Sequence, residues 1–177
     1  MFRVPGRLLA FMFIALSSMA EKFELSEGSM SAGGQAMLNY SSPDISDWNA
    51  DYLNLGVAVN GGFFFLKNLA GVVDAQLTGQ ISDRMESKRR YQFATGIWYA
   101  VDTKSNYYPY VQLLGYVSNV ASGWSAGLMP SLGLLVGLSA QLALDFGFIS
   151  RIDFAISREG STALELGTGF VGIRAFF

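Results

Sequence analysis

Residues 163–177 read ALELGTGFVGIRAFF and alternate between two kinds of side chain. One set is apolar or small throughout: Gly169, Val171, Ile173, Ala175 and Phe177. The interleaved set includes a hydroxyl and a charge, and comprises Leu166, Thr168, Phe170, Gly172, Arg174 and Phe176. A two-residue period is typical of a β-strand with two unlike faces. A strand with one face on lipid and the other on a polar lumen has this pattern.

The same period recurs along the chain and predicts an all-β fold. It is clearest at 52–65, where large apolar residues alternate with Asn, Gly and Ala. We expect eight strands, at 23–40, 52–65, 70–81, 89–101, 108–120, 124–136, 140–154 and 163–177. Pro130 predicts irregular pairing in the sixth strand, because proline has no N–H to donate. Short connections between antiparallel neighbours predict an eight-stranded antiparallel up-and-down transmembrane β-barrel, which closes because an open edge in lipid leaves backbone groups unpaired.

The chain also resembles the small outer-membrane β-barrel proteins of Gram-negative bacteria, of the OmpX and opacity-protein type. In that family a terminal Phe, with apolar residues at alternate positions before it, is the signal read by the barrel-assembly machinery. Phe177, Ile173 and Val171 stand at the matching positions, and Ala175 is a weaker member of the set. The resemblance implies a location in the outer membrane, with both chain ends in the periplasm. It also implies contact with periplasmic chaperones and assembly machinery during biogenesis, and with outer-membrane lipid and lipopolysaccharide afterwards.

In this orientation the aromatic residues form two bands, as expected at the two membrane interfaces. The outer band is expected to contain Tyr40, Trp48, Tyr52, Tyr91, Trp124 and Phe154. The periplasmic band is expected to contain Phe63, Phe64, Phe65, Tyr99, Tyr108, Tyr110 and Phe177.

Residues 1–20 have the pattern of a secretory signal peptide. Arg3 and Arg7 precede an apolar run at 8–16, and Ser18-Met19-Ala20 predicts cleavage after Ala20. The run is shorter than the roughly 20 residues that a membrane-spanning helix needs, which disfavours the alternative of an N-terminal anchor. We therefore expect one barrel domain at 21–177. Since the chain has no cysteine, its stability comes from packing and backbone pairing.

Charge decides which face of the barrel is inside. The polar set contains few charges of mixed sign: Asp74, Arg90, Asp145, Arg151, Asp153 and Arg174. A water-facing wall would be about a quarter to a third charged. We therefore place these six residues in the lumen, as a paired polar network, and the apolar set on lipid. An eight-stranded lumen is wide enough only for side chains, which predicts a plugged monomer without a wide channel.

The composition argues against catalysis. The chain has no histidine and no cysteine, which excludes Ser-His-Asp and Cys-His sites and the commonest transition-metal ligands. We expect no enzyme activity, no cofactor and, at a net charge of −2, no nucleic-acid binding. Asp44, Asp47 and Asp51 lack the ordered spacing of a calcium loop and are better interpreted as a solvated acidic loop. Gly115, Gly127, Gly133, Gly137 and Gly147 lack the strand-to-helix context of a phosphate loop, and we expect them to relieve crowding.

A basic run stands at the start of the fourth strand. Lys88 and Arg89 could bind lipopolysaccharide phosphates by charge-assisted hydrogen bonds. The alternative is a charged strand end with Arg90 turned into the lumen, and the sequence leaves both open. The best hypothesis is an integral outer-membrane barrel with a structural or surface-contact role. A small porin-like passive pore and a soluble periplasmic lipid-binding barrel are the alternatives.

Overall fold

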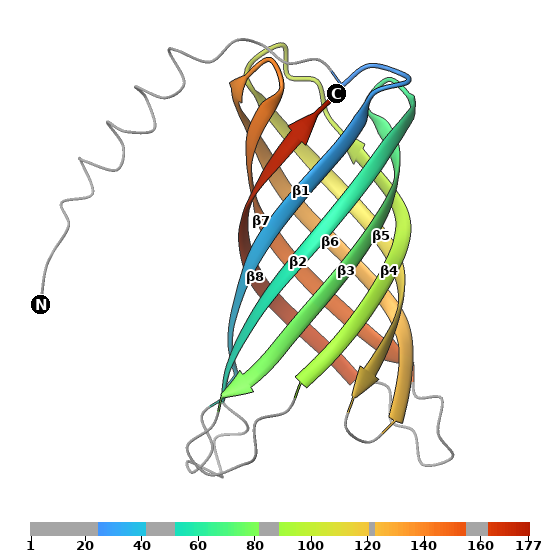
Figure 1. Ribbon diagram of the computed structural model, residues 1–177, viewed down its shortest axis with the longest axis vertical. Helices are drawn as coiled ribbons and strands as arrows, with labels where there is room; N and C mark the ends of the chain where they lie inside the picture. The colour runs from blue at the N-terminus through green and yellow to red at the C-terminus, as the bar shows by residue number, and fades with distance from the viewer. Residues whose placement is uncertain (1–24, 42–51, 82–88, 121–122, 155–162) are drawn as a thin grey trace, which may run out of the picture.

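The chain forms one closed barrel (Figure 1). The computed structural model describes residues 25–41, 52–81, 89–120, 123–154 and 163–177. Each strand pairs antiparallel with the next, and the last pairs with the first. The predicted all-β, eight-stranded, antiparallel up-and-down barrel is confirmed. No helix among the described residues is long and apolar enough to cross a bilayer.

The strands lie close to the predicted ranges. They are β1 (Met30–Ser41), β2 (Tyr52–Leu66), β3 (Leu69–Ile81), β4 (Arg89–Ala100), β5 (Tyr107–Val120), β6 (Gly123–Ser139), β7 (Leu142–Phe154) and β8 (Ala163–Phe176). The connections β2–β3, β4–β5 and β6–β7 lie together at one end of the barrel, which we call the turn end and which is uppermost in Figure 1.

The predicted start of the first strand at residue 23 is wrong, because β1 begins at Met30. The preceding residues instead make a turn, in which the Ser29 amide donates to the Ser26 carbonyl at 3.2 Å. Gly28 has a φ of 84°, a left-handed conformation that glycine adopts without steric cost. The turn brings Leu25 into the buried core, where its carbonyl accepts from the Asn68 amide at 3.0 Å. These residues therefore pack against the turn end instead of extending the sheet.

The predicted turn at 137–139 is also wrong, because β6 continues to Ser139. A register shift in the β6–β7 ladder between Gly137 and Ser139 lets pairing continue to the strand end. Gln141 lies in the turn between β6 and β7 and is exposed. The irregular pairing predicted around Pro130 is confirmed. Pro130 lies opposite Leu113 of β5, but it and Met129 have no Cα partner in the β7 ladder.

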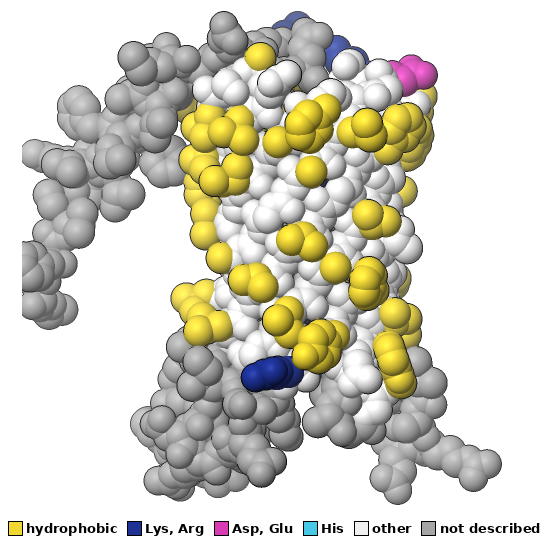
Figure 2. Space-filling model, in the orientation of Figure 1, with side chains coloured by type: hydrophobic (Ala, Val, Ile, Leu, Met, Phe, Trp, Pro, Cys, Tyr) yellow, Lys and Arg dark blue, Asp and Glu magenta, His cyan; other side chains and the backbone are white. Residues whose placement is uncertain are grey.

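The period of two residues sorts the side chains into a lumen set and a wall set. Along β4, buried Gln92, Ala94, Trp98 and Ala100 alternate with exposed Tyr91, Phe93, Ile97 and Tyr99. Figure 2 shows apolar side chains over the described wall, most densely toward its two ends. The core of the protein is thus the filled interior of the barrel, and its exposed surface is the apolar one. This agrees with the predicted assignment of faces.

Candidate functional site

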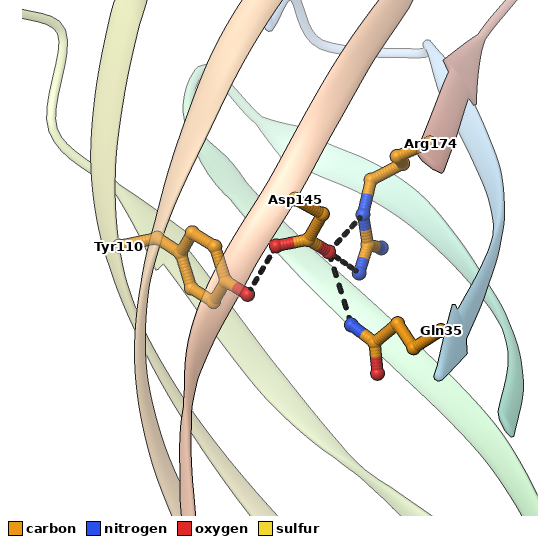
Figure 3. Close-up of polar contacts among 4 residues, drawn as sticks. All are labelled: Gln35, Tyr110, Asp145 and Arg174. Carbon is orange, nitrogen blue, oxygen red and sulfur yellow. Dashed lines mark hydrogen bonds and ion pairs between the residues drawn. The ribbon is translucent and has the colours of Figure 1, made fainter. Parts of the chain in front are cut away.

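The polar centre of the lumen is built on Asp145 of β7, whose side chain is 1% exposed. Its Oδ2 accepts from Arg174 Nη2 at 2.9 Å and Nε at 3.2 Å, and from Gln35 Nε2 at 3.0 Å. Its Oδ1 accepts from the Tyr110 hydroxyl at 2.6 Å (Figure 3). A buried charge is tolerated when it is paired and hydrogen-bonded in this way. We call these four residues the Asp145 centre.

Strand register and two glycines bring the Asp145 centre together. Gly172 of β8 lies opposite both Asp145 of β7 and Gln35 of β1, so no side chain separates those two. A Cβ on Gly172 would lie 2.7 Å from Gln35 Cγ. Gly133 of β6 likewise leaves room for the Tyr110 ring of β5, because a Cβ on Gly133 would lie 2.2 Å from Tyr110 Cζ. The tyrosine ring therefore crosses β6 and places its hydroxyl on β7.

An aromatic layer fills the lumen on the turn-end side of the Asp145 centre. The guanidinium carbon of Arg174 lies 4.7 Å from the centre of the Trp98 ring. Trp98 in turn packs against Phe64 at 5.2 Å, against Tyr110 at 5.4 Å and against Phe176 at 6.5 Å between ring centroids. These rings are buried, and together with Leu25 they belong to one apolar cluster. Arg174 thus lies between a carboxylate and an aromatic face, each of which favours its charge.

The aromatic layer corrects part of the predicted periplasmic band. Phe64, Tyr108 and Tyr110 were expected on the wall, but all three are buried in the lumen. Phe64 stands between Phe63 and Phe65, so the pleat of β2 directs it to the opposite face from its neighbours. The remaining band members whose side chains the structure describes are exposed: Phe63, Phe65, Tyr99 and Phe177 at the turn end, and Tyr91, Trp124 and Phe154. The side chains of Tyr40 and Tyr52, and all of Trp48, lie outside the described residues.

The six charges predicted for the lumen are distributed over several contacts. Asp145 and Arg174 form a direct ion pair. Arg151 donates from Nη2 to Gln76 Oε1 at 2.9 Å, and Asp153 accepts from the Tyr116 hydroxyl. The other two are buried Asp74 on β3, within electrostatic reach of Arg151 and Arg174, and half-buried Arg90 on β4.

The sequence analysis missed two neutral members of the lumen, Gln35 and Tyr110. Gln35 and Tyr110 complete the Asp145 centre, and Gln76 and Gln92 direct their Nε2 atoms to Met129 Sδ at 3.6 and 3.2 Å. These four residues occupy the alternate positions of their strands that face the lumen. Continuing the two-residue count through β1 and β5 would have identified Gln35 and Tyr110 as inward-facing.

The expected role of the glycines holds for three of them. A Cβ on Gly127, Gly133 or Gly147 would lie within 3 Å of an aromatic ring of the neighbouring strand. Gly115 was wrongly included, because it faces the wall and a Cβ there would meet only Thr95 O at 3.9 Å. Inward glycines opposite aromatic residues are therefore what fits large side chains into the narrow lumen.

The residues expected to signal assembly lie on the wall. Val171, Ile173 and Phe177 are exposed, and Ala175 is half-exposed. Phe177 exchanges two backbone hydrogen bonds with Met30, at 3.0 and 2.9 Å. Of the expected lipopolysaccharide contacts, Arg89 is exposed at the first position of β4, whereas Lys88 lies outside the described residues. The signal segment 1–20 and the acidic loop with Asp44, Asp47 and Asp51 lie outside them too.

The chemistry of the lumen is that of a structural network. The Asp145 carboxylate is engaged with four donors and lies away from bulk solvent. A general base needs a lone pair within reach of a substrate proton. Within the described part of the chain, no group of three or more acidic side chains could hold a metal ion.

No protein-family model matches the sequence, and no curated protein matches it. Solved structures do match the fold. Neisserial surface protein A (NspA) superposes with a TM-score of 0.62 at 18% identity, over 85% of this chain and 98% of that one. The outer membrane protein OprG from Pseudomonas aeruginosa gives 0.59 at 14% identity, over 89% and 99%. Ail, the attachment invasion locus protein of Yersinia pestis, gives 0.51 at 12% identity, over 85% and 99%. The superpositions establish a shared fold, and at identities this low they establish the fold alone. The predicted resemblance to small outer-membrane barrels is confirmed at the level of the fold.

Proposed function

We propose that this chain is a monomeric integral β-barrel of the outer membrane, with a structural or surface-contact role and no catalytic activity. One observation carries the proposal: the barrel exposes its apolar set and buries its charges. Val59 and Phe93 are 66% and 70% exposed on the wall, whereas Asp145 and Arg174 are 1% and 2% exposed in the lumen. This distribution is stable only if the wall contacts lipid.

The same distribution argues against a soluble lipid-binding barrel. Such a protein lines its interior with apolar side chains and wets its polar set. Here the interior contains a hydrogen-bonded ion pair at 2.9 Å. Among strand side chains that the structure describes, the exposed charge is Arg89, at the outermost position of β4.

The filled interior also argues against a passive pore. The Asp145 centre occupies the lumen, and the layer of Phe64, Trp98 and Phe176 lies between it and the turn end. We expect no large, steady conductance steps in planar lipid bilayers. Large, steady conductance steps from single inserted molecules would instead support the porin-like alternative.

Extraction behaviour tests the membrane assignment directly. We expect the protein to require detergent for extraction from envelopes, and to migrate differently in gels before and after boiling. Closed membrane barrels resist unfolding by detergent without heat, since their backbone hydrogen bonds are all satisfied within the barrel. Release into the buffer without detergent, with no shift on boiling, would support the soluble barrel.

The proposal includes export through residues 1–20 and recognition of Val171, Ile173, Ala175 and Phe177 by the assembly machinery, with periplasmic chaperones as transient partners. Deleting Phe177 should lower the amount of protein in the outer membrane far more than replacing the turn residue Gln141. Because deletion also removes the backbone pairing with Met30, Phe177→Ala isolates the side chain. Wild-type levels of Phe177→Ala in the outer membrane would contradict recognition of the ring.

A further inference from the structure

The wall of the barrel contains a gap in the backbone pairing between β6 and β7. This β6–β7 gap comprises Met129 and Pro130 on β6 and Ser150 and Arg151 on β7, which have no Cα partner in the ladder that joins these two strands. The register is the same immediately on both sides of the gap, so Met129 lies opposite Arg151 across it. Ser150 also lacks a Cα partner in the β7–β8 ladder, where the register shifts between Ile149 and Arg151. Unpaired backbone groups are costly in lipid, so this part of the wall should open more readily than a continuous ladder.

Two tyrosine–aspartate contacts hold the strands together on either side of the β6–β7 gap. On one side the Tyr110 hydroxyl donates to Asp145 Oδ1 at 2.6 Å. On the other side the Tyr116 hydroxyl donates to Asp153 Oδ1. Each tyrosine projects from β5 and crosses a glycine of β6 to reach its aspartate on β7. The gap is therefore bounded by two contacts between β5 and β7, and both of them lie outside it.

The side-chain amide of Gln76 lies inside the lumen and contacts both edges of the β6–β7 gap. Its Oε1 accepts from Arg151 Nη2 at 2.9 Å, and its Nε2 donates to Met129 Sδ at 3.6 Å. Gln76 is 5% exposed and projects from β3, four strands away from β7 around the closed barrel (Figure 1). Gln92 of β4 also donates to Met129 Sδ, at 3.2 Å, but its Oε1 has no hydrogen-bond partner among the described residues. Gln92 thus contacts the β6 edge, whereas Gln76 joins the two edges.

We propose that Gln76 is a clamp that keeps the β6–β7 gap closed, and that the folded barrel opens first at this gap. Between Met129 and Arg151, contacts to one side-chain amide take the place of the missing backbone pairing. The two edges cannot separate while both contacts persist, because the amide is anchored on the far side of the lumen. Loss of the amide leaves the gap held only by the two tyrosine–aspartate contacts at its ends. This opening is a property of the wall and goes beyond the proposed structural or surface-contact role.

The test is amide hydrogen exchange of the folded protein in lipid nanodiscs, followed residue by residue by NMR. The reporters are Ile149 and Ile152, the β7 residues that flank the gap. In the wild type they should exchange faster than Val57 and Leu77, which pair with each other in the continuous part of the β2–β3 ladder. Gln76→Met keeps the length of the side chain and removes the amide. We expect it to speed exchange of the two reporters about tenfold, the effect of losing roughly one net hydrogen bond.

Two variants with the same substitution control for general effects. Gln92→Met removes a contact to Met129 from the neighbouring inward position on β4, but leaves the link to Arg151 intact. Gln35→Met removes an amide from the Asp145 centre, away from the gap. Both should leave exchange of the two reporters within about twofold of the wild type, because neither separates the edges of the gap.

Wild-type exchange of Ile149 and Ile152 in Gln76→Met would overturn the clamp, and so would an equal rise along all strands, which would indicate a general loss of stability. Reporters that exchange as slowly as Val57 and Leu77 in the wild type would overturn the gap as the first place to open. The migration shift on boiling verifies that each variant is folded. If Gln76→Met does not fold, Arg151→Lys replaces it, since this variant keeps the charge and removes the Nη2 donor. It should produce the same local rise in exchange.

Discussion

Val72 and Val73 are consecutive residues of β3, yet they belong to two regions with different physical demands. Val72 is 2% exposed in the lumen, and Val73 is 61% exposed on the wall. Lipid chains are fluid and adapt to whatever apolar shape the wall presents. The lumen is a closed cylinder of fixed width, so its side chains must fit one another at crystal-like density. We therefore expect the lumen to be sensitive to shape and the wall to be sensitive mainly to polarity.

The largest effect should come from breaking the ion pair of the Asp145 centre. Asp145→Leu leaves the Arg174 guanidinium buried without its carboxylate, which should lower the free energy of unfolding by about 3–5 kcal/mol. Urea unfolding in lipid vesicles measures this loss in the free energy of unfolding. The double variant Asp145→Leu with Arg174→Met removes both charges and should recover most of the loss. A double variant as unstable as the single one would show that packing, and not the unpaired charge, is responsible.

Removing the central ring of the aromatic layer should have the next largest effect. Trp98→Ala should lower the free energy of unfolding by about 3 kcal/mol, because it removes a buried ring and leaves a cavity among Phe64, Tyr110 and Phe176. Because Trp98 and Asp145 both contact Arg174, their substitutions should not be additive. A double-mutant cycle on urea unfolding measures the coupling energy. Strict additivity would mean that the aromatic layer and the Asp145 centre are independent.

A single methyl group on an inward glycine should have a smaller but clear effect. The Cβ of Gly133→Ala would lie 2.2 Å from the Tyr110 ring and force it away from Asp145, at a cost of about 1–3 kcal/mol. Gly115→Ala is the matched control on the wall, where the Cβ meets only Thr95 O at 3.9 Å. Comparing the urea midpoints of the two variants isolates the crowding. Equal midpoints would contradict the bridging role of Gly133.

The smallest effect is expected for one added methylene on the two faces of β3. Val72→Leu overpacks the lumen and should destabilise the barrel by about 1 kcal/mol. Val73→Leu adds the same methylene on the lipid side, where we expect a change of less than about 0.5 kcal/mol in either direction. The comparison uses thermal or urea unfolding in the same lipid. A larger loss for Val73→Leu would contradict the distinction between wall and lumen.

The strands and their faces were predictable because both depend on local geometry. Alternation at Val171, Ile173 and Arg174 is a property of consecutive residues, and a closed sheet converts it directly into outside and inside. The same argument placed Asp74, Asp145 and Arg151 in the lumen. It failed at 23–29, because the turn at Gly28 and the burial of Leu25 depend on contacts with β2 and the β2–β3 turn.

The membership of the candidate site was not predictable to the same degree. Tyr110 and Asp145 meet across an intervening strand, and this requires both the registers of β5, β6 and β7 and a glycine at the crossing point. Gln35 meets Asp145 only because β8 closes onto β1 with Gly172 between them. Register and closure are set by the whole sheet and cannot be counted from one strand.

The sequence by itself determined that the protein is an eight-stranded barrel with an apolar exterior and charges inside, because the alternation of side chains depends only on consecutive residues. Only the tertiary structure decided which inward residues become partners and which aromatic rings fill the lumen instead of the wall. The physical reason is that alternation assigns a face, whereas contact requires a neighbour. Neighbours in a closed barrel come from strands far apart in the chain.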